Sequence, residues 1–256
     1  MMPLRMQPAA RYHYERWRGL LERELPIFCS QIKPQDVVVD VGANVGIYVH
    51  ALRRRGAIVE AFEPQPECSA VLQAYATANP SVHVHTVALG DAESIVTLSV
   101  PIEHGRLART SGTTRAISAG AGETIRVPVR TLDSFGLKRV NAMKIDVEGA
   151  ELDVLRGAVR TIERARPLLL VEIEQRHHAG PMQAVFDWII ERGYEGTFLL
   201  PSHGFRPLSE FNAREHQRLD SDRCPTGLYV NNFIFRSKVP PPDAKSPGVV
   251  YRGASA

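Results

Sequence analysis

The stretch VVVDVGANVGIYVHALRRRG, residues 37–56, decides the fold class. An apolar run typical of a buried strand ends at Asp40, and a segment of helical period begins near Gly46. The glycines are spaced Gly42-x-x-x-Gly46, whereas a dinucleotide fingerprint needs G-x-G-x-x-G and a P-loop needs a following Gly-Lys-Ser/Thr. The turn therefore predicts an adenosine-type ligand without a pyrophosphate.

The rest of the chain alternates short apolar runs with segments of helical period, which is typical of a parallel sheet with crossover helices. A first helix is predicted from roughly Tyr12 to Ser30. Further strands are predicted at 57–64, 82–89, 141–145, 167–174, 194–200 and 227–235. Two alternating segments between residues 94 and 132 predict an antiparallel hairpin. The loop inside it, 102–123, is rich in Gly, Ser, Thr and Arg. A loop of this length is typically functional or disordered, and one role open to its GTTR segment (112–115) is a lid over the cofactor.

Two acids at the predicted sheet edge narrow the choice of ligand. Asp40 ends the first strand and would suit a cationic group, while Glu63 follows the second strand, where an acid can accept hydrogen bonds from both ribose hydroxyls. A ligand with a ribose and an ammonium but no phosphate fits this pair, and S-adenosylmethionine is such a ligand. In the alternative reading, Asp40 only caps the helix and Glu63 is a solvated loop acid.

Four motifs occur in an order that resembles one methyltransferase family. They are VVDVGANVGIY (38–48), AFEPQP (61–66), VRTLDSF (129–135) and MKIDVEGAELDVLRGA (143–158). Together they resemble the FkbM family of S-adenosylmethionine-dependent methyltransferases over roughly residues 35–175. The resemblance implies a class I methyltransferase Rossmann-like α/β fold: a seven-stranded, mostly parallel sheet with helices on both faces and an inserted antiparallel hairpin. It also implies methylation of a hydroxyl, on a sugar or glycan or on a secondary metabolite.

The resemblance also assigns site residues. Those expected around the methionine part of the cofactor are Asp40, Gly42, Ala43, Asn44 and Gly46. Glu63 would hold the ribose, and the segment from Ala88 to Asp91 would flank the adenine. Asp146 would face the reacting methyl group and the substrate.

Three acids are candidates for the catalytic role, namely Asp146, Glu148 and Glu172. All three are predicted at the carboxyl ends of strands, where open parallel sheets bind ligands. In one mechanism a carboxylate or a histidine, His177 or His178, deprotonates the acceptor hydroxyl. In the other, Asp146 and Glu172 hold a divalent ion such as Mg²⁺, which lowers the pKa of the hydroxyl. We favour no obligatory metal, because no acid cluster has an obvious ligand spacing.

Domain organisation, location and partners follow from composition. We expect an N-terminal helical cover (1–34), which packs as an amphipathic cover or a homodimer contact, a methyltransferase domain (35–238) and a Pro-rich flexible tail (239–256). The net charge is only +3 without long basic blocks, which argues against nucleic acid. The sequence shows neither the apolar core of a signal peptide nor an 18-residue apolar stretch, so we expect no membrane partner. Three cysteines form no CxxC, so we expect a cytoplasmic protein with a small-molecule or glycan acceptor.

Two other functions compete with this interpretation. An NAD(P)-dependent Rossmann oxidoreductase is disfavoured by the missing middle glycine and by the lack of a Tyr-x-x-x-Lys pair. A non-catalytic methyltransferase-like binding protein is disfavoured because Asp40, Glu63 and Asp146 are all present.

Overall fold

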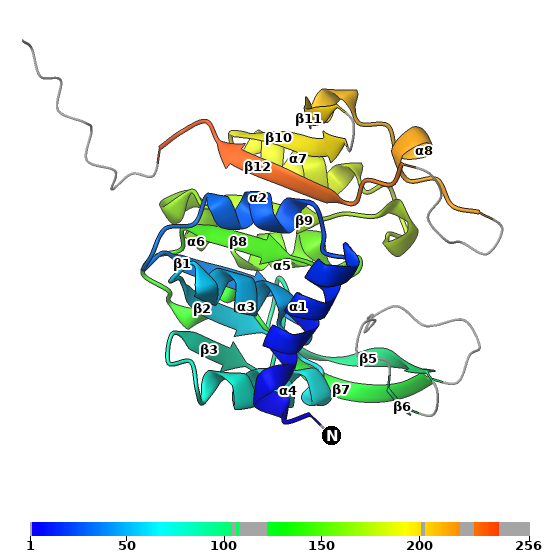
Figure 1. Ribbon diagram of the computed structural model, residues 1–256. Helices are drawn as coiled ribbons and strands as arrows, with labels where there is room; N and C mark the ends of the chain where they lie inside the picture. The colour runs from blue at the N-terminus through cyan, green and yellow to red at the C-terminus, as the bar shows by residue number, and fades with distance from the viewer. Residues whose placement is uncertain (1, 104–105, 108–121, 201–202, 221–227, 241–256) are drawn as a thin grey trace, which may run out of the picture.

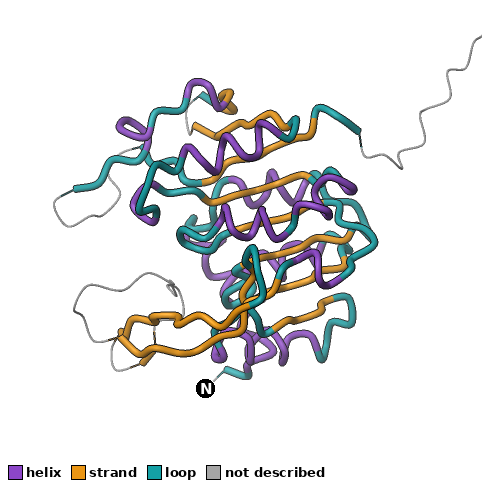
Figure 2. Tube along the Cα trace, turned by 180° about the vertical axis from the view of Figure 1, so that it is seen from behind, coloured by secondary structure: helices purple, strands orange, loops and turns teal. Residues whose placement is uncertain are grey.

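The computed structural model describes residues 2–103, 106–107, 122–200, 203–220 and 228–240. Within them the chain forms one large mixed sheet with helices on both faces, and a smaller sheet that projects from one end (Figures 1 and 2). The strands of the large sheet, in spatial order, are β11 (Gly204–Pro207), β10 (Tyr194–Leu200), β12 (Asn232–Ser237), β9 (Leu168–Glu172), β8 (Ala142–Ile145), β1 (Val37–Val41), β2 (Ile58–Phe62) and β3 (Val82–His85).

The five strands from β9 to β3 run parallel, and β12 pairs antiparallel with β9. β1 is central because its residues are apolar on both sides. Val38 packs into the core on one face, Val39 and Val41 pack into the core on the other, and none is more than 1% exposed. Burying each such valine contributes about 1.5–3 kcal/mol, which is why a continuous apolar run becomes an internal parallel strand.

Two layers of helices cover the sheet (Figure 1). One face carries α2 (Glu24–Ser30), α3 (Ile47–Arg54) and α4 (Pro66–Ala76), with α1 (Gln7–Arg18) crossing over α3 and α4. The other face carries α5 (Glu151–Gly157), α6 (Val159–Ala165) and α7 (Gln183–Glu191). The short helix α8 (Ala213–His216) precedes β12, and single 3₁₀ turns lie at Leu4–Met6, Leu132–Phe135, Gln175–His177 and Leu208–Glu210.

The predicted hairpin is confirmed. β5 (Ser94–Glu103) pairs antiparallel with β7 (Gly122–Arg130), and β4 (Ala88–Leu89) and β6 (Arg106–Leu107) extend this small sheet. Most of the predicted lid and of the predicted tail lies outside the described residues. None of the helices in the described ranges combines the length and the apolar character that a membrane crossing requires.

The structure corrects the number of strands in the large sheet. Eight strands were found where seven were predicted, and the additional one is β11 at the edge. It is four residues long, largely exposed and ends in Pro207. Its sequence GFRP has no alternation of apolar and polar residues, which is why the strand was not predicted. Proline is tolerated at a sheet edge because no neighbouring strand needs its missing N–H.

Two predicted elements are divided. The helix predicted from Tyr12 to Ser30 is two helices, because Gly19 adopts a left-handed conformation with φ of 67° and ends α1. The strand predicted at 82–89 splits into β3 of the large sheet and β4 of the small one. Asp133 lies in the 3₁₀ turn before β8, and its carboxylate accepts hydrogen bonds from the backbone N–H groups of Arg160 and Thr161 at the start of α6.

Candidate active site at the carboxyl edge of the sheet

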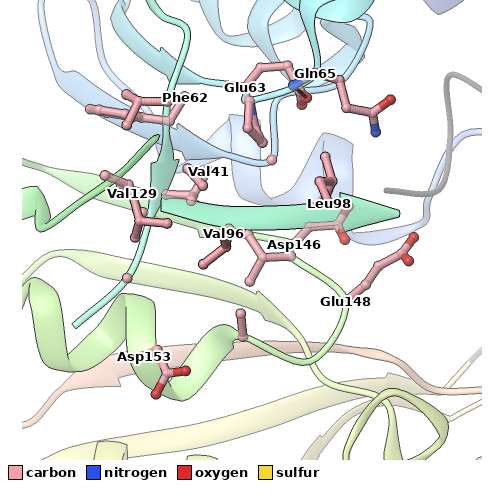
Figure 3. Close-up of a pocket in the computed structure, with 18 of the residues that line it drawn as sticks. Val41, Phe62, Glu63, Gln65, Val96, Leu98, Val129, Asp146, Glu148 and Asp153 are labelled. Carbon is pink, nitrogen blue, oxygen red and sulfur yellow. Dashed lines mark hydrogen bonds between the residues drawn. The ribbon is translucent and has the colours of Figure 1, made fainter. Parts of the chain in front are cut away.

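The larger pocket lies where β1, β2, β8 and β9 end, and its volume is about 540 Å³. Its lining includes eight of the residues singled out from the sequence: Gly42, Asn44, Glu63, Ala88, Asp91, Asp146, Glu148 and Glu172. Figure 3 shows Glu63 and Asp153 on opposite sides of the pocket, with Asp146 and Glu148 between them. The parallel strands therefore bring residues more than 100 positions apart to one site.

The glycine turn is held against the neighbouring strands. The backbone N–H groups of Gly42 and Ala43 donate to the carbonyl oxygen of Phe62 at 3.0 and 3.1 Å. A Cβ on Gly42, whose φ is 76°, would lie 1.8 Å from the backbone oxygen of Asp146. The backbone of Asn44 has a φ of 51°, a left-handed conformation that residues other than glycine seldom adopt. Only glycine allows β1 and β8 to end this close together.

Glu63 occupies the position expected for a ribose partner. Its carboxylate oxygens accept hydrogen bonds from the backbone N–H groups of Asn44 and Gln65, both at 2.8 Å. The side chain is nearly buried, and burial raises the pKa of Glu63 to about 7 despite these two donors. Each oxygen keeps a second lone pair, so the carboxylate can still accept hydrogen bonds from a diol.

An apolar slot adjoins Glu63. Phe62, Val87, Ala88 and Leu89 form part of its wall, and exposed Asp91 lies at the same end. The hairpin closes the pocket with three further apolar side chains, Val96, Leu98 and Val129 (Figure 3). The sequence predicted the hairpin but not that it forms a wall of the site.

The three candidate acids differ in environment. The carboxylate of Asp146 forms an ion pair with Lys144 at 2.8 Å. Burial and the charge of Asp146 raise the pKa of Glu148 to about 7, and this residue is held at a φ of 51°. Burial and Asp146 also raise the pKa of Glu172 well above its ordinary value. Glu172 accepts a hydrogen bond from Asn231 at 2.7 Å.

A partner acid takes the negative charge next to Glu172. Glu174 accepts hydrogen bonds from Glu172 and from the Tyr229 hydroxyl and pairs with Arg176 at 2.5 Å. Burial opposes its ionisation, but these partners outweigh burial and lower the pKa of Glu174. Glu172 is therefore the protonated member of this pair and Glu174 the ionised one.

Asp40 lies behind the pocket lining rather than in it. Its side chain is 0% exposed, and neither oxygen accepts a hydrogen bond from the residues that the structure describes. Burial raises the pKa of Asp40 to about 6, although Lys144 opposes this. Burial likewise opposes the charge of Lys144, but Asp146, Asp40 and Glu22 outweigh it and raise the Lys144 pKa. A role of Asp40 toward a cationic ligand would therefore act through the charge balance around Lys144.

Lys144 and Glu22, which lie near Asp40 and Asp146, were not predicted from the sequence as site residues. Lys144 could have been found, because it lies between Met143 and Ile145 in a buried strand and a buried cation requires acidic partners. Glu22 comes from the N-terminal segment, far from every motif. It lines a second pocket of about 210 Å³, together with Ala43 and Gly46. This smaller pocket meets the larger one at Gly42, Asn44 and Asp146, which line both.

The remaining predictions concern histidines and a metal. Neither His177 nor His178 lines the two pockets, and His178 lies 3.1 Å from Glu151. Within the part of the chain that the structure describes, no three acids, histidines or cysteines are arranged to hold a metal ion. The described residues thus offer no support for the Mg²⁺ alternative.

Comparisons with known proteins agree with this geometry. Residues 40–195, more than half of the 256, match the family described as "Methyltransferase FkbM domain". "Methyltransferase 1" of Beauveria bassiana (strain ARSEF 2860) is 29% identical over 154 residues, which cover 50% of this chain and 62% of that protein. "2-O-methyltransferase NoeI" of Sinorhizobium fredii (strain NBRC 101917 / NGR234) is 26% identical over 194 residues, covering 66% and 80% respectively.

A solved structure supports the fold. The crystal structure of "Methyltransferase FkbM" from Methylobacillus flagellatus KT is similar to this chain, with a TM-score of 0.50 and 19% sequence identity. The similarity covers 91% of this chain and 48% of the chain in that crystal structure. The α/β sheet and the pocket at its carboxyl edge define a class I methyltransferase fold. The chain belongs to the FkbM family of S-adenosylmethionine-dependent methyltransferases. This membership argues against the oxidoreductase alternative.

Proposed function

We propose that this protein transfers a methyl group from S-adenosylmethionine to a hydroxyl of a sugar, a glycan or a secondary metabolite. The observation that carries the proposal is the meeting of Glu63, Asp146 and Glu148 in one pocket at the carboxyl edge of the sheet. The relative NoeI is named a 2-O-methyltransferase, which supports transfer to oxygen.

The pocket residues fit the cofactor in charge and shape. Glu63 would accept hydrogen bonds from the ribose, and the slot between Phe62 and Leu89 would take the adenine. Around Lys144, the carboxylates of Asp40, Asp146 and Glu22 outnumber the cation, which favours a positively charged ligand. When bound, S-adenosylmethionine supplies an electrophilic methyl group for an in-line displacement.

Of the three candidate acids, Glu148 suits the role of general base best. A base is most effective when its pKa is near the working pH, and the pKa of Glu148 is about 7. Asp146, paired with Lys144, would orient the acceptor hydroxyl. Glu172 is protonated and donates its hydrogen bond to Glu174, so it does not suit the role of general base.

The test is binding followed by turnover. Calorimetry should show S-adenosylhomocysteine binding to the wild type and to Glu148→Gln with similar affinity. With a panel of hydroxylated and amine-bearing acceptors, S-adenosylhomocysteine should form with the hydroxylated ones. Turnover of the wild type should rise with pH through about 7, whereas Glu148→Gln should be slower and lack this rise. Binding without transfer to any acceptor would favour a non-catalytic binding protein instead.

A further inference from the structure

The smaller pocket lies between the N-terminal segment and the glycine turn. Arg11, Glu15 and Glu22 line it from the N-terminal side, while Tyr48 at the start of α3 and Lys144 line it from the domain. The family match begins at residue 40, so the N-terminal wall lies outside the part of the chain that shows the family.

The two pockets together have the chemistry of a ligand with two unlike ends. The larger pocket offers Glu63 beside apolar walls, which suits a nucleoside. The smaller pocket carries side chains of both charge signs, which suits a zwitterion. Because Gly42, Asn44 and Asp146 line both, one molecule can pass across the glycine turn from one pocket into the other.

Of the three acids that line the smaller pocket, Glu22 is the one that forms no ion pair with the described residues. Glu15 is paired with Arg11, and Asp146 is paired with Lys144. The Oε2 atom of Glu22 accepts hydrogen bonds from the Tyr48 hydroxyl at 2.6 Å and from the Asn232 amide at 3.3 Å. Its Oε1 atom accepts none within the described residues.

The surroundings of Glu22 favour a cation at that atom. Glu22 is an exposed residue of the segment between α1 and α2, and it lines the wall of the smaller pocket. Burial raises the pKa of Glu22 above its ordinary value, and Lys144, shared with Asp40 and Asp146, offsets this only in part. A ligand ammonium would remove the cost of this desolvated charge.

We propose that Glu22 is a cofactor-binding residue whose carboxylate accepts a hydrogen bond from the α-amino group of S-adenosylmethionine, the amino-acid end of which occupies the smaller pocket. The inference rests on the proposed function, because it requires that cofactor. It makes the N-terminal segment part of the cofactor site rather than only a cover over α3 and α4.

The competing role for Glu22 is structural, since its two hydrogen bonds join the N-terminal segment to α3 and β12. Glu22→Gln separates the two roles, because glutamine keeps an oxygen for Tyr48 and Asn232 but loses the charge. Binding is measured by calorimetry with S-adenosylhomocysteine and with 5′-methylthioadenosine, which lacks the amino-acid end. Glu24→Gln is the matched control, since Glu24 lies two residues further on and lines neither pocket.

Glu22→Gln should weaken S-adenosylhomocysteine binding about ten-fold or more, the effect of losing one hydrogen bond to a charged group. Binding of 5′-methylthioadenosine should stay within about two-fold of the wild type, a free-energy change below about 0.5 kcal/mol. Tyr48→Phe removes one of the hydrogen bonds that orient Glu22. It should weaken binding of S-adenosylhomocysteine more than binding of 5′-methylthioadenosine, but by a smaller factor than Glu22→Gln.

Three results would overturn the inference. Glu22→Gln could weaken both ligands equally, or neither. If Glu22→Gln does not fold, an equal effect of Tyr48→Phe on both ligands would have the same meaning. A wild-type protein that binds neither S-adenosylmethionine nor S-adenosylhomocysteine would instead overturn the proposed function, and this inference with it.

Discussion

Replacing Glu63 by glutamine should have opposite effects on stability at high pH and on cofactor affinity. The carboxylate is 4% exposed, and burial raises its pKa from 4.5 to about 7. Below pH 4.5 the group is protonated in both the folded and the unfolded state. As pH rises toward 7 the unfolded chain releases this proton first, so the folded wild type loses stability over this window.

The size of the effect follows from the pKa. A change from 4.5 to about 7 corresponds to about 3 kcal/mol of unfolding free energy, of which about 2 kcal/mol should be lost between pH 5 and pH 8. Glu63→Gln lacks this loss. Its amide group would, however, face one of the two backbone donors, from Asn44 or Gln65, at a pH-independent cost of about 1–3 kcal/mol.

Urea unfolding at several pH values from 5 to 8 measures the difference directly. The unfolding free energy of Glu63→Gln relative to the wild type should rise by about 2 kcal/mol over this range. Calorimetry should show binding of S-adenosylhomocysteine about ten-fold weaker. Glu67→Gln, an exposed acid on α4, controls for the loss of one carboxylate. A stability difference that does not change with pH would refute the argument from burial, and unchanged affinity would remove Glu63 from the ribose site.

Three further variants test the surroundings of the site. Gly42→Ala should lower the unfolding free energy by more than about 2 kcal/mol, because its Cβ would meet the backbone oxygen of Asp146 at a positive φ; wild-type stability in urea would contradict this. Lys144→Met should cost about 3–5 kcal/mol by leaving buried carboxylates without a cation, and adding Asp40→Asn should restore part of the loss in the same assay. Asp133→Ala should lower the unfolding free energy by about 1–2 kcal/mol, because the start of α6 loses its cap. Binding of S-adenosylhomocysteine should stay unchanged, and weaker binding would contradict the placement of Asp133 outside the cofactor site.

Local patterns were sufficient for the central strands and for much of the site. The apolar run at Val37 predicts a strand because burial on both faces needs no alternation. Gly42 predicts a turn because its backbone must accept a conformation and a close contact that other residues reject. Glu63 and Asp146 could be placed because each follows a buried strand, and parallel strands bring their carboxyl ends to one edge. By contrast, β11 has no apolar period and was missed.

The sequence by itself determined the fold class, the family resemblance and the acids at the sheet edge, since these depend on periodicity and on the position of residues along a strand. Only the tertiary structure decided what each acid does. Lys144 lies near Asp40, Asp146 and Glu22 because three separate segments pack together, and desolvation by that packing sets the pKa values of Glu63 and Glu148. Burial and long-range contact are properties of the folded chain, so no local pattern around Glu22 could reveal that it lines the pocket.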